Sequence, residues 1–224
     1  MKIKQLSEHV FKLEFWFGLK ISTWIVKDKH HVYLIDTGMA RMANKQIEFA
    51  QRLGEVKAIF LTHGHSDHIG GCEKILQKLE IPVYSHQREL TYINNEAPYP
   101  GREKMENTKM KGKVNPLVVD NNHILHECNC LQAFLTPGHS PGHVAYYHRE
   151  DDVFIAGDLF REKKGDLYPP IKKFTANMDE NIRSGKIVEE INPTTLTTCH
   201  SGEVEDAAYL YKNYVANFYT GKHS

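Results

Sequence analysis

Four side chains of the kinds that bind metals lie within six positions of one another. The stretch LTHGHSDHIGG contains His63, His65, Asp67 and His68. Three histidines beside a carboxylate would compete for the same few hydrogen-bond partners in a core unless a cation lay between them. The stretch therefore predicts a metal site.

The spacing of these residues favours two ions. His63 and His65 are two positions apart in an extended segment, so both side chains can point the same way and hold one ion. Asp67 and His68 come where the chain turns into the next helix, and they face a neighbouring position that can hold a second ion. We expect the nearby glycines, such as Gly64, to let the backbone turn tightly there.

Three more candidate ligands follow segments that have the composition of strands. His139 follows QAFLTPG, Asp158 follows VFIAG, and His200 follows TTLTTC. Strand ends in an α/β sheet expose side chains to a shared crevice, so these residues can reach one site. Imidazole and carboxylate ligands without a thiolate suit zinc in an open catalytic site, with iron and manganese as alternatives.

The elements that must position these ligands alternate between strands and helices. We predict strands in VFKLEFWF, ISTWIVK, HVYLIDTG, VKAIFLTH, IPVYS, LQAFLTPGH, GHVAYYH, DVFIAGD and TTLTTCH. We predict helices at about residues 42–53, in CEKILQKLE, at about residues 178–190 and from about residue 205. This alternation indicates a layered α/β domain.

The length of 224 residues fits one domain. We expect residues 1–224 to form a single domain with an inserted cap or loop at about residues 86–119. Prolines, glycines and charged residues interrupt the core periodicity in that segment.

Charge balance and the N-terminal segment limit the partners and the compartment. The 28 basic and 28 acidic residues cancel, which favours a small-molecule substrate over a nucleic acid or an anionic membrane. The N-terminal segment lacks the apolar stretch of a secretory signal, and no run approaches the length of a membrane span. The four cysteines form no disulfide framework. We expect a cytoplasmic protein, and its aromatic residues leave a homodimer as an open alternative.

Five motifs, taken together, resemble the metallo-β-lactamase superfamily. They are LIDTG at 34–38, HxHxDH at 63–68, TPGHSPGH at 136–143, AGDLF around Asp158 and TCHSG around His200. The likeness runs from about residue 20 to about residue 202 and includes the glyoxalase II and acyl-homoserine lactonase branch. It implies an αββα sandwich, in which two mixed β-sheets pack face to face between helices with metals at one edge.

The resemblance also implies a role for each candidate residue. It places His63, His65 and His139 on a first ion, and Asp67, His68 and His200 on a second, with Asp158 bridging both. Asp36 then holds the histidine loop in shape from outside the ligand set. In the same pattern, His143 is expected to pack or support rather than to bind.

We therefore interpret the chain as a metal-dependent hydrolase that cleaves an ester, lactone or thioester bond of a small molecule. Two divalent ions, zinc in the first place, would lower the pKa of a bridging water enough to form hydroxide near neutral pH. Asp67 is the catalytic candidate that orients this hydroxide and passes its proton to the leaving group.

Departures from the related families narrow the substrate. Secreted β-lactamases that resemble this chain usually carry Cys or Ser where it has Asp158. Glyoxalase II-type thioesterases share this aspartate but carry a long helical segment for glutathione, whereas a short segment follows His200 here. Acyl-homoserine lactonases place a tyrosine three positions after the aspartate, where this chain has Arg161, so a phenol would have to come from elsewhere, such as Tyr168.

Two aromatic residues are candidates for the wall of a substrate pocket. Trp16 lies in EFWFG just before a predicted hairpin turn, and Tyr168 lies in a polar loop. We interpret both as candidate substrate-binding residues, with an ordinary sheet position as the alternative for Trp16.

Other functions on the same scaffold stay open. A mononuclear iron enzyme similar to the persulfide dioxygenases would use one ion, and a phosphodiesterase would cleave a different bond. A non-enzymatic relic would be expected to have lost ligands, whereas this chain keeps all seven.

Overall fold

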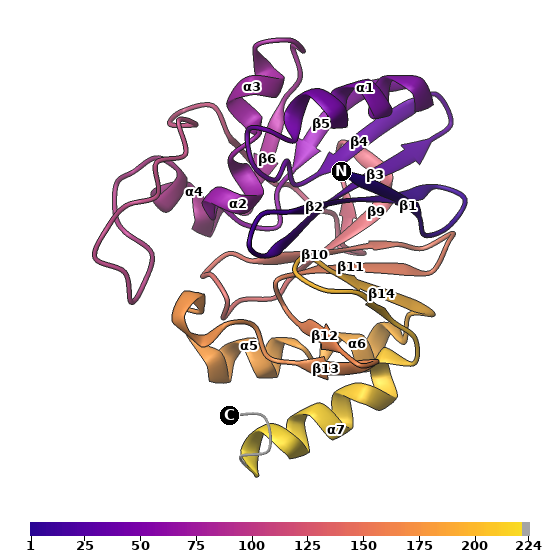
Figure 1. Ribbon diagram of the computed structural model, residues 1–224, viewed down its shortest axis with the longest axis vertical. Helices are drawn as coiled ribbons and strands as arrows, with labels where there is room; N and C mark the ends of the chain where they lie inside the picture. Colours follow the sequence, from indigo (N-terminus) through magenta and orange to yellow (C-terminus); the bar gives the residue numbers. More distant parts are fainter. Residues whose placement is uncertain (221–224) are drawn as a thin grey trace.

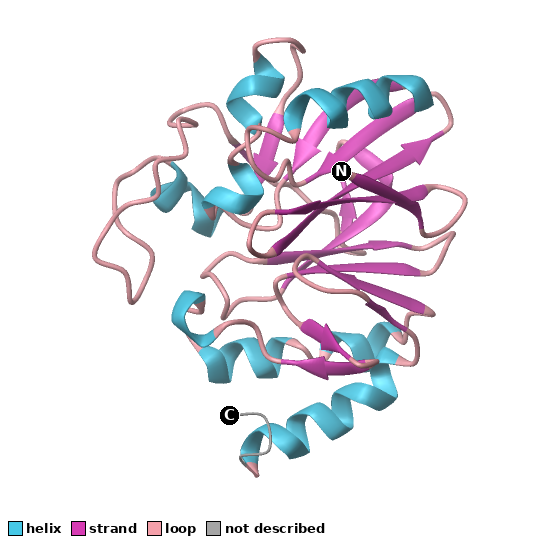
Figure 2. Ribbon diagram, viewed as in Figure 1, coloured by secondary structure: helices cyan, strands magenta, loops and turns pink. Residues whose placement is uncertain are grey.

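Two β-sheets pack face to face between two groups of helices (Figures 1 and 2). The computed structural model describes residues 1–220, so the last four residues of the predicted domain lie outside the described part. The layer order of helix, sheet, sheet and helix confirms the αββα class predicted from the sequence.

The first sheet is built from the N-terminal half of the chain. In spatial order its described strands are β1 (Lys2–Gln5), β2 (Val10–Trp16), β3 (Lys20–Asp28), β4 (His31–Ile35), β5 (Glu55–Phe60), β6 (Val83–Ser85) and β7 (Asn115–Pro116). Strands β1 to β4 pair antiparallel, and β4 to β7 pair parallel. The sheet is therefore mixed.

The second sheet is built from the C-terminal half. In spatial order its described strands are β15 (Glu203–Val204), β14 (Thr195–Thr198), β11 (Val153–Gly157), β10 (Val144–His148), β9 (Cys128–Leu135) and β8 (Ile124–Leu125). A separate hairpin of β12 (Arg161–Lys163) and β13 (Asp166–Tyr168) follows β11. Within the sheet β11 and β14 are parallel, whereas β10 is antiparallel to both of its neighbours.

The helices cover the outer faces of the two sheets (Figure 1). On the side of the first sheet lie α1 (Ala43–Leu53), α2 (Ser66–Ile69), α3 (Cys72–Leu76) and α4 (Gln87–Ile93). On the side of the second lie α5 (Met178–Ser184), α6 (Ile187–Ile191) and α7 (Ala207–Tyr219), with a 3-10 turn at Lys172–Phe174. Among the described residues, no helix has the length and apolar character to cross a bilayer.

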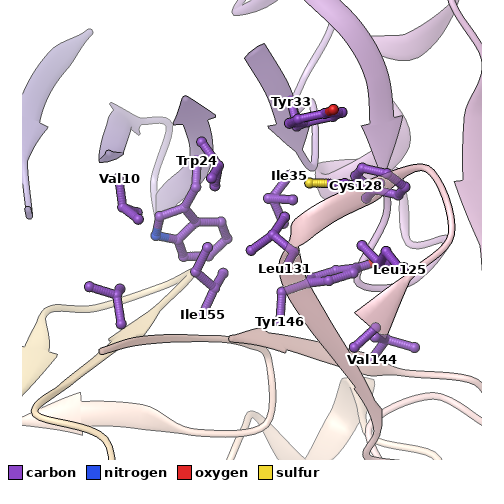
Figure 3. Packing of buried hydrophobic residues seen from close by; sticks show 14 of the residues in the cluster. Val10, Trp24, Tyr33, Ile35, Leu125, Cys128, Leu131, Val144, Tyr146 and Ile155 are labelled. Atoms are coloured by element: carbon purple, nitrogen blue, oxygen red, sulfur yellow. The ribbon is translucent and has the colours of Figure 1, made fainter. Parts of the chain in front are cut away.

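Alternation along the strands creates three hydrophobic layers. On β3, Trp24 and Val26 point into the space between the sheets, whereas Ile25 packs with the residues under α1. On β11, Ile155 joins the layer between the sheets and Phe154 packs toward the C-terminal helices. Figure 3 shows the middle layer, which holds the two sheets together. The period of two therefore lets one strand serve two layers.

Two predicted helices are shorter than their sequence patterns indicate. The helix predicted at about 178–190 divides into α5 and α6 at Gly185, which is a poor helix former. A Cβ at Gly185 would lie 2.6 Å from the Tyr211 ring, so this glycine also allows close packing against α7. The predicted helix CEKILQKLE ends at Leu76, and the chain then extends through Pro82 into β6.

The segment predicted as an inserted cap or loop, at about 86–119, begins with α4 and ends near β7. Between these two elements the chain contains turns and bends but no long element. The segment lies to one side of the first sheet (Figure 1).

We expect the buried tryptophan to matter for stability and the exposed one not to. Trp24→Phe removes the indole N–H that donates to Thr197 Oγ1 at 3.1 Å across the sheets, and it leaves space in the core. The free energy of unfolding should fall by about 1–3 kcal/mol, measured by urea unfolding with circular dichroism. Trp16→Phe, at a residue that is 72% exposed, should change it by less than about 0.5 kcal/mol. Equal effects of the two substitutions would contradict this packing.

Candidate metal centre

The seven predicted ligands converge at one edge of the two sheets. Strands β9, β11 and β14 run in the same direction, so the residues that follow them, His139, Asp158 and His200, emerge at the same edge. The histidine stretch follows β5 in the other sheet, and Val144 N donates to Thr62 O at 2.8 Å where the two sheets meet. The sandwich thus brings together segments that lie far apart in the sequence.

Three buried histidines form the first cluster. Nδ1 of His65 lies 2.8 Å from Nε2 of His63 and 3.0 Å from Nε2 of His139. This is the group of three that the resemblance implied for the first ion.

The outward hydrogen bonds of these rings assign their protons. The Thr62 hydroxyl donates to Asp36, so its oxygen accepts the N–H at Nδ1 of His63 at 3.0 Å. The Thr175 hydroxyl donates to a backbone carbonyl and accepts the N–H at Nδ1 of His139 at 3.2 Å. Both Nε2 atoms therefore direct lone pairs at His65, and a single ring proton cannot satisfy them both. A cation at their meeting point would do so.

The second cluster contains His68, Asp158 and His200. Nε2 of His200 lies 3.1 Å from Asp158 Oδ2, and Nε2 of His68 lies 3.5 Å from Asp158 Oδ1. Nδ1 of His200 donates to the Lys20 carbonyl at 2.7 Å, so this ring also turns Nε2 toward the centre. Two buried atoms, His68 Nε2 and Asp158 Oδ1, have no hydrogen-bond partner. Because orphaned buried polar atoms are costly, this donor set fits a divalent ion.

Asp158 joins the two clusters. The same Oδ2 that faces His200 lies 3.2 Å from Nε2 of His139 in the first cluster. This position between the clusters is the one that the resemblance implied for a bridging ligand.

Asp67 is the most solvent-accessible of the predicted ligands. It lies in the first turn of α2, its side chain is 31% exposed, and Oδ2 is 3.3 Å from Nε2 of His200. The same oxygen lies 4.0 Å from Nε2 of His68. Asp67 therefore borders the second cluster and also faces the open side of the site.

Asp36 lies beneath both clusters and is fully buried. Its carboxylate accepts hydrogen bonds from Thr62 N at 2.7 Å, from the Thr62 hydroxyl at 2.8 Å and from His68 Nδ1 at 2.7 Å. The bond to Nδ1 leaves Nε2 of His68 directed at the second cluster. The structure thus places Asp36 where the sequence predicted a supporting carboxylate.

His143 is buried beside the site, and its ring contacts the backbone N–H of the candidate ligand Asp158. Nε2 of His143 accepts the Asp158 N–H at 3.1 Å, and Nδ1 lies 2.8 Å from the Thr136 hydroxyl. Burial lowers the pKa of His143 to about 3, so the ring is neutral. Since its Nε2 lone pair is already used, His143 supports Asp158 and is not directed at the clusters.

Cys199 was not predicted to lie in the ligand set. Its sulfur and one ligand atom each of His68, Asp158 and His200 lie within 4.8 Å of one another. Burial raises the pKa of this thiol, but the positive charges of His200 and His68 outweigh burial and lower it. The sequence interpretation left cysteine out of the donor set and did not anticipate this sulfur beside the second cluster. The only signal in the sequence was the position of Cys199 directly before His200.

Glu89 was also missed, and it connects the two ligand loops. This buried carboxylate accepts hydrogen bonds from Gly64 N at 3.0 Å, Tyr99 Oη at 2.5 Å, Ser140 Oγ at 2.7 Å and Gly142 N at 2.7 Å. It therefore ties the loop of the first histidines to the loop that follows β9. No sequence pattern marks it, because its partners meet only in the folded chain.

The electrostatics of the two clusters differ. Burial lowers the pKa values of His63 and His65 well below the usual value, and neighbouring histidines lower them further. Burial also brings the pKa of His139 to about 4, against the opposing effect of the Asp158 carboxylate. These three rings are neutral at pH 7, which is the form that binds metals. At His200 burial lowers the pKa, but Asp158 and Cys199 outweigh it and raise it to about 12.

A cavity of about 250 Å³ opens beside the clusters. Its lining includes the predicted ligands His65, Asp67, His139, Asp158 and His200. Its apolar wall includes Leu19, Phe160, Ile171 and Phe174.

The two predicted substrate-binding residues lie apart from this lining. Trp16 lies at the exposed end of β2, and Tyr168 lies on β13. Neither is among the described residues that line the cavity. Their proposed contact with substrate stays a prediction.

A third group of ligand-type residues, His9, His148 and Asp151, lies near the far end of β10. Here the polar atoms satisfy one another. Asp151 accepts from His9 N at 2.7 Å and from His9 Nδ1 at 2.8 Å, and Asp151 N donates to His148 Nδ1 at 3.2 Å. This group closes the N-terminal segment onto the sheet without needing a cation.

The fold and its two adjacent clusters of ligand-type residues are those expected of a metal-binding αββα protein. A family model described as the metallo-beta-lactamase superfamily matches residues 16–208. The chain belongs to this superfamily, as its motifs predicted.

Curated relatives agree with this assignment. The chain is 47% identical over 222 residues to the probable metallo-hydrolase YybB of Bacillus subtilis, with 97% of this chain and 99% of the relative covered. It is 29% identical over 157 residues to a hydroxyacylglutathione hydrolase of Buchnera aphidicola, with 66% of this chain and 54% of the relative covered. The family and these relatives support a metal-dependent hydrolase.

Solved structures show the same fold at low sequence identity. A metallo-beta-lactamase from Pontibacter korlensis gives a TM-score of 0.74 at 15% identity, with 96% of this chain and 97% of that chain covered. A metallo-beta-lactamase from Erythrobacter litoralis gives 0.73 at 17% identity, with 94% and 96% covered.

We expect Glu89 to be needed for tight metal binding. Glu89→Ala removes the acceptor that joins the two ligand loops, so affinity at the first cluster should fall about 10- to 100-fold. Competition with a chromophoric chelator measures this change. Glu103→Ala removes an exposed carboxylate from the same segment and serves as the control. Equal affinities of the two variants would show that Glu89 does not hold the ligands.

Metal binding should also release protons. In the metal-free protein His200 is protonated at pH 7, because its pKa lies at about 12. A histidine binds a metal only after losing this proton, so apparent affinity should rise with pH by about tenfold per unit for each proton released. Calorimetry in two buffers with different protonation enthalpies should detect the release at pH 7. A measured release of zero would contradict the assignment.

Proposed function

We propose that the protein is a dinuclear metal-dependent hydrolase that cleaves an ester, lactone or thioester bond of a small molecule. The observation that carries the proposal is that polar atoms in two adjacent clusters face one another without enough hydrogen-bond partners. Lone pairs of His63 and His139 converge on His65, and His68 Nε2 and Asp158 Oδ1 lack partners. Residues of both clusters line the same cavity.

The proposed ligand sets follow the two clusters. His63, His65 and His139 would hold one ion, and Asp67, His68 and His200 would hold the other, with Asp158 shared between them. Nitrogen and oxygen donors favour zinc, with iron and manganese as alternatives. The sulfur of Cys199 beside the second set adds a donor that zinc accepts well.

The residues of the chain have distinct parts in the reaction. Bound divalent ions would supply Lewis acidity, which lowers the pKa of water and polarises a carbonyl group. Asp67 orients the attacking water and takes its proton, because its carboxylate is both close to His200 and open to the cavity. It then returns the proton to the leaving group. Asp36, Glu89 and His143 hold the ligands in place from behind.

The cavity favours a small substrate with an apolar part. Its volume of about 250 Å³ suits a small molecule, and Leu19, Phe160 and Ile171 offer apolar contact next to the ligands. The hydroxyacylglutathione hydrolase relative supports hydrolysis of an acyl bond, although the chain matches only about half of that protein.

A substrate screen tests the proposed bond class. Zinc- or manganese-loaded protein is assayed against a thioester, a lactone, a phosphodiester and a β-lactam, with His63→Ala as the control. We expect turnover of the thioester or the lactone and its loss in the variant. Activity that survives His63→Ala would count against the metal argument, and activity on the phosphodiester alone would favour the phosphodiesterase alternative.

Metal analysis separates hydrolysis from oxidation. Two zinc ions per chain support the dinuclear hydrolase, in agreement with two clusters. One iron per chain with thiol-dependent oxygen consumption would instead support an enzyme similar to the persulfide dioxygenases.

We expect Asp67 to contribute mainly to turnover. Asp67→Ala should leave the first ion bound and lower kcat about 100-fold or more, because it removes the group that moves the proton. Metal content and kcat are measured on the same preparation. Unchanged turnover in a fully metal-loaded Asp67→Ala variant would remove Asp67 from the mechanism.

A further inference from the structure

The cavity contains an arginine to which the proposed reaction gives no part. Arg102 comes from the segment between α4 and β7 and lines the cavity with a side chain that is 21% exposed. Its guanidinium carbon lies 5.5 Å from the ring centre of Tyr99 and 5.7 Å from that of Phe174. Nη1 pairs with Glu106, and Nη2 lies 2.9 Å from Nε2 of His65. The stacking holds the guanidinium in a defined position.

The contact with His65 is incompatible with metal binding by that residue. Nδ1 of His65 is the nitrogen that faces His63 and His139. A neutral histidine that binds an ion through Nδ1 carries its proton on Nε2, which makes Nε2 a donor. A guanidinium has only donors. Once His65 serves as a ligand, Nη2 of Arg102 keeps the long contact to the Phe174 carbonyl at 3.5 Å, and its other N–H can take a further acceptor beside the cavity.

A second guanidinium lines the same cavity. Arg161 lies on β12, and its Nε donates to the Pro169 carbonyl at 2.8 Å. This bond fixes the side chain and uses one N–H group of the guanidinium. The proposed function assigns Asp67 and Asp158 to the ions, and Glu106 is paired with Arg102. With both ions bound, the ions and side chains around the cavity would therefore carry a net positive charge.

We propose that Arg102 and Arg161 select substrates that carry a carboxylate in addition to the bond that is cleaved. Paired N–H groups of a guanidinium match the two oxygens of a carboxylate, and Arg102 already holds one carboxylate, because its Nη1 donates to one oxygen of Glu106. The apolar wall would contact the carbon chain between the two groups. The choice of scissile bond rests on the proposed function, whereas the preference for an anion rests on the two arginines.

Two probes that cannot be cleaved as esters test the preference. N-methylglutaramic acid carries a carboxylate and an amide, and N,N′-dimethylglutaramide carries two amides and no charge. Calorimetry on zinc-loaded protein should show the acid binding about tenfold tighter or more. Arg102→Met and Arg161→Met should each lower the ratio of the two affinities at least about threefold. Arg52→Met, at an exposed arginine of α1, is the control and should leave the ratio unchanged.

An unchanged ratio in both Arg102→Met and Arg161→Met would overturn the proposal, because the ions alone would then account for anion binding. The binding measurement needs no turnover, so it is independent of the screen for the scissile bond. If the zinc-loaded protein cleaves no acyl substrate but its preference for the acid over the diamide depends on the arginines, the proposed function fails and the anion site stands. If it cleaves acyl substrates with a preference that the variants leave intact, the anion site fails and the proposed function stands.

Discussion

The buried carboxylate of Asp36 is the interaction on which the rest of the site depends. One oxygen accepts the backbone N–H of Thr62, and the other accepts both the Thr62 hydroxyl and His68 Nδ1. This arrangement orients His68 directly and His63 through the Thr62 hydroxyl, so a single side chain positions one candidate ligand in each cluster. Asp36 has a φ of +58°, which non-glycine residues rarely adopt, and its three hydrogen bonds offset that cost.

The position of Asp158 depends on the sandwich fold and not on Asp36. Asp158 must reach both clusters, and it does so because β11 ends at the edge where the two sheets meet. Gly157 precedes it with a φ of +54°, and a Cβ there would lie 2.9 Å from Nε2 of His143. A larger residue would displace the histidine that accepts the Asp158 N–H. The chain therefore positions the carboxylate that joins the two clusters through backbone shape as well as through side chains.

Ligand types and strand periodicity were readable in the sequence, whereas contacts between loops were not. The histidine stretch is dense enough to predict a metal site, and its motifs predicted the fold. Glu89 and Cys199 carry no such signal, because their partners come from segments that meet only after folding. Gly64 also differs from the prediction, since a Cβ there would lie 2.5 Å from Ile93 and from the hydroxyl of Tyr99. Glycine is needed at position 64 because a side chain would not fit there, and not because the backbone must turn.

Short elements were missed for a related reason. Strands of two to four residues, such as β8, β12 and β15, are too short for a hydrophobic period to show, and pairing with a longer neighbour defines them. Arg102 likewise belongs to a segment with little periodicity, and its place over His65 follows from the fold of that whole segment.

Anomalous diffraction at the zinc absorption edge, from crystals of the zinc-loaded protein, tests the central claim most directly. The account predicts two peaks. One should lie among His63, His65 and His139, and the other beside His68 and His200, with Asp158 between them. A single peak, or a peak found only at His9, His148 and Asp151, would contradict it.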